Sequence, residues 1–390
     1  MKTSAGLKAI FCASAAALAI GGAAAQSAPG FAPPKTAWGV PDLQGTWSNA
    51  SITKMQRPNE FPNLVMTPAE AAKAEKGDYY NNRRAEDAKP ADPNDKRLLD
   101  GSDLLSGGGY NGFWVDPGSK VAVVKGELRS SWIVDPPSGK IPYKGGRSGA
   151  RPAAAPVPAT VPATGPVRPA PGTPGAPTGA AKPGAATVQG PGAVDRNAGG
   201  GFGSYNGPEA RPIGERCLVG FGGTGGPVMN NVLYNNHYQI VQSPNYVMID
   251  IEMDHDARII PLVKDATAAR HGPETIPKWL GDSVGWYEGE TLVVETRNVN
   301  PQQRGYISSA GKLTERFTRW NKDQILYEFS VEDPTLYSQP WKGEMSLNLS
   351  KEPLYEYACH EGNYAMRGIL AGARMQERDG KVVATNTAEE

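Results

Sequence analysis

The amino-acid sequence predicts a mainly β protein: an antiparallel β-barrel or sandwich, lipocalin-like, with a short N-terminal helix and a C-terminal helix. The first observation behind this prediction is the stretch 237–262, in which two runs of alternating apolar and polar residues flank a turn at Ser243-Pro244-Asn245. The second is that similar hairpin patterns recur along the rest of the chain. The third is that the connections are short, which favours a meander of antiparallel strands.

Residues 1–25 have the pattern of a secretory signal peptide. Lys2 and Lys8 precede a largely apolar run at 9–20, and three alanines stand directly before Gln26. We expect cleavage after residue 25 and an exported protein, periplasmic or secreted. The apolar run is too short for a permanent transmembrane helix and no later segment is more apolar, so we expect no stable membrane insertion.

The balance of charges bears on nucleic-acid binding, and the number of cysteines bears on disulfide formation. The 40 basic and 40 acidic residues balance, which gives no electrostatic footprint for nucleic acid, so we expect no nucleic-acid partner. Removal of the signal peptide takes Cys12 with it and leaves Cys217 and Cys359. In an oxidising compartment this pair predicts one disulfide, with free or metal-binding thiols as the alternative.

Composition divides the chain into segments. Between 137 and 201 proline, alanine and glycine dominate, and no carboxylate occurs before Asp195. Such a segment cannot bury enough apolar surface to offset its chain entropy, so we expect a disordered insertion inside one β domain. The predicted segments are a signal peptide at 1–25, a flexible leader at 26–40, the first part of the β domain at 41–136, the insertion at 137–201, the main β domain at 202–376 and a polar tail at 377–390.

Helix and strand signals follow in order. Thr67 as N-cap, Pro68 in the first turn and Glu70 three residues after the cap predict a helix near 67–82. A short helix is expected from about 364 to 373. Strands are expected near 113–115, 121–124, 129–134, 237–242, 246–254, 259–262, 284–296 (a hairpin turning at 288–289), 313–320, 324–332, 341–349 and 354–359.

The run 246–254 has the densest group of ionisable side chains. Read with period two, one strand face takes Val247, Ile249, Ile251 and Met253, and the other takes Met248, Asp250, Glu252 and Asp254. Three carboxylates on one face repel one another unless cations, water or a ligand screen their charges. Two interpretations stay open: a solvated outer face of the sheet, or a polar barrel interior.

Several longer motifs are similar to a family of exported bacterial proteins of unknown function. They are WLGDS at 279–283, YEGETLVVET at 287–296, ERFTR at 315–319, VEDP at 331–334 and YEYACHEGNY at 355–364, together with IVDPP at 133–137, RCL at 216–218 and HDARIIPL at 255–262. The resemblance covers nearly all of the mature chain outside the insertion and implies no reaction. Gly45-Thr46-Trp47 also resembles the Gly-x-Trp that opens lipocalin-type barrels, although an ordinary core tryptophan fits equally.

Histidines beside carboxylates are the usual equipment for proton transfer near neutral pH. We predict Glu252, His255 and His360 as proton-transfer groups and Arg258 as the clamp for an anionic group. For each histidine, a structural hydrogen bond to an aspartate or glutamate is the alternative. The residues predicted to bind the ligand are His237, Asp256, Arg258, Glu295, Glu315, Tyr327, Trp341 and Glu361. We expect no cofactor and no metal, because no pair of suitable ligands has a recognised metal spacing.

Two short motifs are set aside on structural context. Gly-x-Ser-x-Gly at 281–285 lacks the strand before and the helix after its serine that a nucleophile elbow requires. The glycine-rich run at 220–225 is followed by Pro227 where a dinucleotide-binding helix would begin.

The sequence thus favours an exported enzyme that uses metal-independent acid and base residues. The reaction classes that fit are lyase, isomerase and hydrolase, acting on a carbohydrate or a plant-derived aromatic small molecule. The alternative is a calycin-type small-molecule-binding protein without chemistry.

Overall fold

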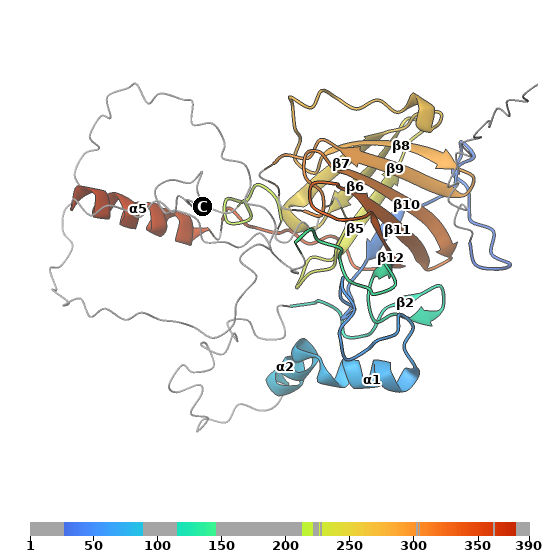
Figure 1. The fold of residues 1–390 in the computed structure, drawn as a ribbon, viewed down its shortest axis with the longest axis horizontal. Coiled ribbons are helices and arrows are strands. Elements are labelled where there is room, and N and C mark those ends of the chain that lie inside the picture. The colour runs from blue at the N-terminus through green and yellow to red at the C-terminus, as the bar shows by residue number, and fades with distance from the viewer. Residues whose placement is uncertain are drawn as a thin grey trace, which may run out of the picture.

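The computed structural model describes residues 27–88, 115–145, 213–220, 226, 228–301, 303, 305–361 and 363–379. Its centre is one antiparallel sheet curled into a nearly closed barrel (Figure 1). Along the sheet the strands are β7 (Asp256–Pro261), β6 (Tyr246–Ile251), β5 (His237–Gln242), β1 (Gly45–Ser48), β12 (Trp341–Leu349), β11 (Gln324–Glu332), β10 (Lys312–Asn321), β9 (Thr291–Arg297) and β8 (Asp282–Glu288). The mainly β, barrel-like fold class predicted from the sequence is confirmed.

The two end strands of this order approach each other and nearly close the barrel. Leu262, just after β7, forms a parallel bridge with Gly285 of β8, and the Val263 N–H donates to the Gly285 carbonyl at 2.8 Å. A Cβ on Gly285 would lie 3.0 Å from the Ile260 side chain. The missing side chain therefore permits the close approach of the two strands.

Alternating side chains build the hairpins, as the sequence pattern indicates. In β6, Val247, Ile249 and Ile251 are buried, whereas the residues between them are partly exposed. The turn from β5 to β6 is closed by the Ser243 N–H, which donates to the Tyr246 carbonyl at 2.9 Å. The β8–β9 turn contains Gly289 with φ +59°, a left-handed conformation that favours glycine.

Large side chains fill the barrel interior. Trp47 is fully buried, its Nε1–H donates to the Leu43 carbonyl at 2.9 Å, and the Arg319 guanidinium lies 4.5 Å from its ring centroid. The rings of Phe317 and Tyr327 pack with centroids 4.9 Å apart. The tryptophan of the Gly-x-Trp motif is thus a core side chain clamped by a cation–π contact.

Two helices and a small second sheet pack beside the barrel (Figure 1). Helix α1 (Pro68–Gly77) has the predicted capping box, because Thr67 Oγ1 accepts from the Glu70 N–H and Glu70 accepts from the Thr67 N–H. The helix predicted to run to about 82 is interrupted at Asp78, whose extended backbone starts helix α2 (Tyr79–Asp87). The remaining short strands are β2 (Val123–Val124), β3 (Glu127–Leu128) and β4 (Ile133–Asp135), and β4 pairs with β12.

The C-terminal part differs from its predicted strand. Residues 354–359 form no strand, because the Tyr355 N–H donates to the Glu252 side chain rather than to a neighbouring strand. Helix α5 (Tyr364–Arg378) follows, continues past its predicted end and projects away from the barrel (Figure 1). At the start of the predicted insertion, the Lys144 N–H donates to the Leu336 carbonyl at 2.9 Å, so the ordered fold reaches beyond residue 137.

The predicted signal peptide, most of the insertion and the end of the polar tail lie outside the described residues. Among the helices that the structure describes, none has the length and apolar character needed to cross a bilayer.

Candidate functional site

A hydroxyl, an imidazole and a carboxylate form a chain of contacts at the end of the barrel where β5 begins. Ser350 Oγ lies 3.1 Å from His237 Nε2, and His237 Nδ1 lies 3.0 Å from Glu252 Oε2. With the imidazole proton on Nδ1, the ring donates to Glu252 and accepts from the Ser350 hydroxyl. Nucleophilic catalysis by a hydroxyl uses the same order of groups: nucleophile, base and orienting carboxylate.

The sheet register brings Ser350 to His237. Strand β1 lies between β5 and β12, and its Ser48 pairs with His237 on one side and with Asn348 on the other. Ser350 follows two residues later, and its N–H donates to the Thr46 carbonyl at 2.8 Å. The hydroxyl is therefore held by backbone pairing on the neighbouring strand.

A turn at the end of β6 directs Glu252 toward His237. The strand ends at Ile251, and Glu252 has helical dihedral angles (φ −58°, ψ −37°) at the start of the 3-10 turn η3 (Met253–His255). Glu252 is buried, whereas Asp250 is half-exposed on the strand itself. The predicted single face of carboxylates through 254 is corrected accordingly: the period-two alternation stops at Ile251, and the acidic residues separate there.

Hydrogen bonds keep Glu252 ionised despite its burial. Burial disfavours the carboxylate, but the His237 side chain and the N–H groups of His237 and Tyr355 all donate to it, so the pKa of Glu252 lies below its ordinary value. The hydrogen bond to Glu252 raises the pKa of His237 above its ordinary value in spite of partial burial. The pair is thus a carboxylate that stabilises a protonated imidazole.

Sequence reasoning missed two members of this cluster, Ser350 and the Tyr355 N–H. Ser350 stands 113 residues after His237, and no local motif marks it. A backbone donor leaves no trace in the residue types. The available signal was the position of Ser350 directly after a predicted strand, which many surface serines share.

Two further acidic residues, Asp254 and Asp256, lie shortly after Glu252. Asp254 and His255 both have left-handed backbone conformations (φ 61° and 53°), and both Asp254 oxygens and Asp256 Oδ2 are buried without a hydrogen-bond partner among the described residues. Burial raises the pKa of Asp254 against the charges of His255 and His360. Burial, reinforced by the Asp254 charge and opposed by His255, raises the pKa of Asp256 to about 7.

The raised pKa of Asp256 predicts that the folded state becomes less stable as pH rises. Between the ordinary pKa of 3.8 and about 7, folded Asp256 holds its proton more tightly than the unfolded chain does, so the folded state loses stability as the pH rises through this window. We expect Asp256→Asn to raise the melting temperature at pH 8 and to flatten its pH dependence between about 4 and 7. Thermal melts across this range test it, with exposed Glu274→Gln as control; parallel curves for wild type and Asp256→Asn would contradict it.

The predicted anion clamp, Arg258, lies inside the barrel wall. Its two terminal nitrogens bind the two carboxylate oxygens of Glu315, and the Tyr327 hydroxyl donates to Glu315 Oε1 at 2.8 Å. Arg258 Nη2 also lies 3.2 Å from Thr296 Oγ1. Burial opposes the Arg258 charge, but Glu315 outweighs it and raises the pKa of Arg258. The geometry therefore joins three predicted site residues in a buried ion-pair network whose cation is already neutralised.

The other predicted site residues do not gather around His237. Residues His255, His360 and Glu361 are exposed, and no hydrogen bond joins His255 or His360 to Glu252 in the described part of the chain. Trp341 is fully buried, packed edge to face on Phe329 with centroids 5.7 Å apart. Their catalytic and binding roles stay predictions, and the geometry pairs Glu252 with a histidine that was assigned to ligand binding.

Glu295 lies in a separate histidine–carboxylate cluster. Its Oε1 lies 3.1 Å from His271 Nε2 and accepts from Arg297 Nε at 2.7 Å. The hydrogen bond from His271, with Arg297 assisting against burial, lowers the pKa of Glu295 to about 2. His271 Nδ1 lies 3.0 Å from the Asp282 carbonyl oxygen. The two partners of the His271 ring are a backbone carbonyl and a carboxylate, and neither is a nucleophile that the ring could activate, which favours a structural role for the cluster.

The serine of the Gly-x-Ser-x-Gly match is also committed to structure. Ser283 lies in β8, and its Oγ is 2.8 Å from Thr296 Oγ1 and 3.4 Å from Arg258 Nη2. Within the part of the chain that the structure describes, no imidazole forms a hydrogen bond with Ser283. Most of the glycine-rich run at 220–225 lies outside the described residues.

A half-open groove of 680 Å³ is lined by helix α1 and by residues of the segments 52–66 and 121–130. Its apolar lining includes Phe61, Met66 and Val121, and its rim includes Lys73 and Lys76. A volume of this size suits a small organic ligand. The groove lies outside the barrel, whose interior is occupied by core side chains.

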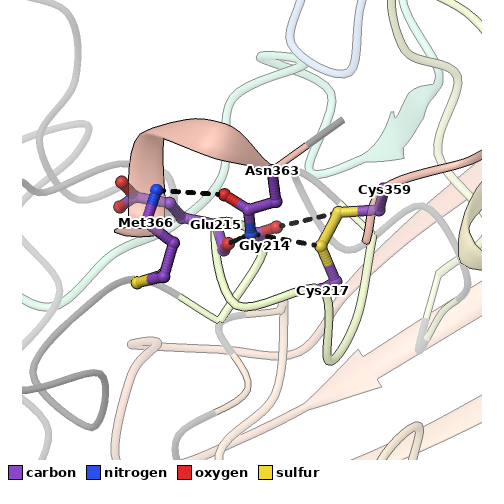
Figure 2. The surroundings of a disulfide bond; sticks show 6 residues. All are labelled: Gly214, Glu215, Cys217, Cys359, Asn363 and Met366. Carbon is purple, nitrogen blue, oxygen red and sulfur yellow. Dashed lines mark hydrogen bonds between the residues drawn. A yellow bond between two sulfur atoms is a disulfide. The ribbon is translucent and has the colours of Figure 1, made fainter. Parts of the chain in front are cut away.

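The predicted Cys217–Cys359 disulfide is confirmed (Figure 2), with an S–S distance of 2.02 Å and Cα atoms 5.8 Å apart. Asn363 sits beside it, donating from Nδ2 to the Glu215 carbonyl at 2.6 Å and accepting at Oδ1 from the Met366 N–H at 3.3 Å. The bridge therefore fastens the segment that follows Ser350, and the start of α5, to residues 213–220.

Within the described residues, no group of three or more histidine, cysteine, aspartate or glutamate side chains has a geometry that would hold a metal ion. Comparison of the chain with protein-family models, with curated proteins and with solved structures found no match. The family resemblance of the motifs stays a prediction, and the function has to be argued from the geometry of the site.

Proposed function

We propose that this protein is an exported hydrolase in which Ser350 is the nucleophile, His237 the general base and Glu252 the orienting carboxylate. The observation that supports the proposal is the unbroken chain of contacts from Ser350 Oγ through both nitrogens of His237 to Glu252 Oε2. The substrate class is an ester of a carbohydrate or of an aromatic acid, in keeping with the classes that the sequence favours.

Each group has a defined task in this reaction. Ser350 Oγ attacks the acyl carbonyl while its proton moves to His237 Nε2, and the Glu252 carboxylate stabilises the imidazolium that forms. The imidazolium then protonates the leaving alcohol, and water, deprotonated by the same ring, releases the acyl group. The Glu352 N–H donates to Ser350 Oγ at 3.1 Å, which favours the charged form of the hydroxyl as the proton leaves.

A fluorophosphonate probe tests the proposal without knowledge of the substrate. An activated serine displaces fluoride from phosphorus and becomes phosphonylated, with the proton passing to the base. We expect wild-type protein to be labelled at Ser350, Ser350→Ala to be unlabelled, and His237→Gln to react at least a thousandfold more slowly. The rate should rise with pH through the raised pKa of His237, because the imidazole must be neutral to act as base.

The matched control is Ser283→Ala, which removes the serine of the competing motif and should leave labelling of Ser350 unchanged. Peptide mass spectrometry identifies the modified serine. Absence of labelling in folded wild-type protein, or equal labelling of Ser350→Ala, would contradict the proposal.

Small-molecule binding without chemistry is the second candidate, and the groove beside α1 is the observation that favours it. Its apolar walls and the exposed Lys76 suit an aromatic carboxylate, whereas Lys73 is already paired with Glu60 of the same groove at 2.7 Å. Saturable binding of such a probe that Ala74→Trp abolishes, in a protein that fluorophosphonate does not label, would favour this function over hydrolysis.

A further inference from the structure

Helix α5 stands apart from the barrel and is held at one end. Figure 1 shows it projecting away from the sheet, and Figure 2 shows its first turn beside the disulfide. Asn363 caps it, with Oδ1 accepting from the Met366 N–H, and ties it to the Glu215 carbonyl. The helix is thus positioned rigidly at its base while most of its length extends outward.

One stripe of α5 is basic. At 3.6 residues per turn, Arg367, Arg374 and Arg378 fall on one stripe. All three are exposed, and none has an ion-pair partner within the described residues. Beside the stripe, Met366 and Leu370 lie on a neighbouring face that continues to Ile369.

Apolar side chains border the arginine stripe on its other side too. Tyr364 is 81% exposed and Met375 is 57% exposed. Around the helix axis both lie next to the arginine stripe, on the side opposite Met366 and Leu370. Helices that lie in the interface of a bilayer combine arginine or lysine side chains with apolar ones, and α5 carries both kinds on adjoining faces. The arginine stems can pack along the acyl boundary while the guanidinium groups bind phosphate oxygens.

We propose that α5 docks this protein onto an anionic lipid surface, with the helix lying in the plane of the interface. Charge complementarity selects this occupant, because three unpaired arginines on one stripe match a layer of phosphate headgroups. The helix is unsuited to cross the bilayer, so the attachment is peripheral. This inference is independent of the proposed hydrolase activity, since it involves none of the residues around His237.

Vesicle co-sedimentation of the full mature chain tests the proposal. We expect binding to vesicles of phosphatidylcholine mixed with phosphatidylglycerol, little binding to pure phosphatidylcholine, and weakening of the attachment as salt rises. The triple variant Arg367→Gln, Arg374→Gln, Arg378→Gln should bind the anionic vesicles on the order of a hundredfold more weakly, at about 1 kcal/mol for each arginine.

A matched control separates a specific helix from general charge. Exposed Lys264, Lys322 and Lys342 lie on the barrel, and changing all three to glutamine alters the net charge equally but should leave binding nearly unchanged. Leu370→Ser should weaken binding even at high salt, since it removes apolar contact. Equal binding of the two triple variants would overturn the proposal, as would self-association that Leu370→Ser abolishes in a protein that ignores anionic vesicles.

Discussion

Replacing Arg258 by methionine is expected to lower the free energy of unfolding by about 3 to 5 kcal/mol. Arg258 is 3% exposed and Glu315 is fully buried, and both carboxylate oxygens of Glu315 bind the guanidinium. Removal of the cation leaves a buried carboxylate that still accepts a hydrogen bond from the Tyr327 hydroxyl but has lost its counter-charge. Urea unfolding followed by tryptophan fluorescence measures the loss.

Two further variants show whether the unpaired charge is the cause. The double variant Arg258→Met, Glu315→Leu should recover much of the lost stability, because apolar groups of similar volume then replace the pair. Lys312→Met, which breaks the partly exposed ion pair with Glu332, should cost less than about 1 kcal/mol. A loss for Arg258→Met no greater than that of Lys312→Met would contradict the buried-charge argument.

The network around Arg258 also shows what sequence patterns can and cannot resolve. Alternation predicted correctly that the side chains of Ile249 and Ile251 point into the core. The alternation does not show whether an arginine is free to bind an anionic ligand or is already neutralised by a glutamate 57 residues away, as Arg258 is. That distinction depends on which strands face each other across the barrel, and local residue types do not encode it.

The fold was predictable because its signals are local. Hairpins follow from period two and turn residues, and the capping box at Thr67 and Glu70 sets the start of α1. The strand order was less accessible, since β1 inserts between β5 and β12 from a distant part of the chain. The same insertion places Ser350 against His237, so the nucleophile of the proposed site could be found only in three dimensions.

Glu252 was predicted for the right chemical reason but with the wrong neighbours. Its acidic surroundings marked the region, yet alternation ends at Ile251 and the following turn buries Glu252 apart from Asp250. A one-residue change from extended to helical backbone was enough to move a carboxylate from a strand face to the end of the barrel. Such turns at strand ends are where period-two reasoning fails and where a barrel can place polar groups for chemistry.

Reduction of the Cys217–Cys359 disulfide is expected to have the other large effect. The cysteines are 142 residues apart, and closing a loop of that length restricts the unfolded chain by about 5 kcal/mol in the chain-entropy treatment. The folded state has its own dependence on the bridge, because the chain from Ser350 to Cys359 is otherwise held to the barrel by contacts such as the Tyr355 N–H to Glu252. Loss of the bridge therefore also loosens the arrangement around His237.

Cys217→Ser and Cys359→Ser, each in the mature chain, separate these two consequences. Urea unfolding should show a loss of about 3 to 5 kcal/mol for either variant relative to the oxidised parent, and the two losses should agree because each variant removes the same bridge. If the protein stays folded, fluorophosphonate labelling of Ser350 should slow more than the loss of stability alone explains, since the serine then samples positions away from His237. Equal stability of the parent with and without reductant would show that the bridge constrains neither state, and unchanged labelling would show that strand pairing alone positions the serine.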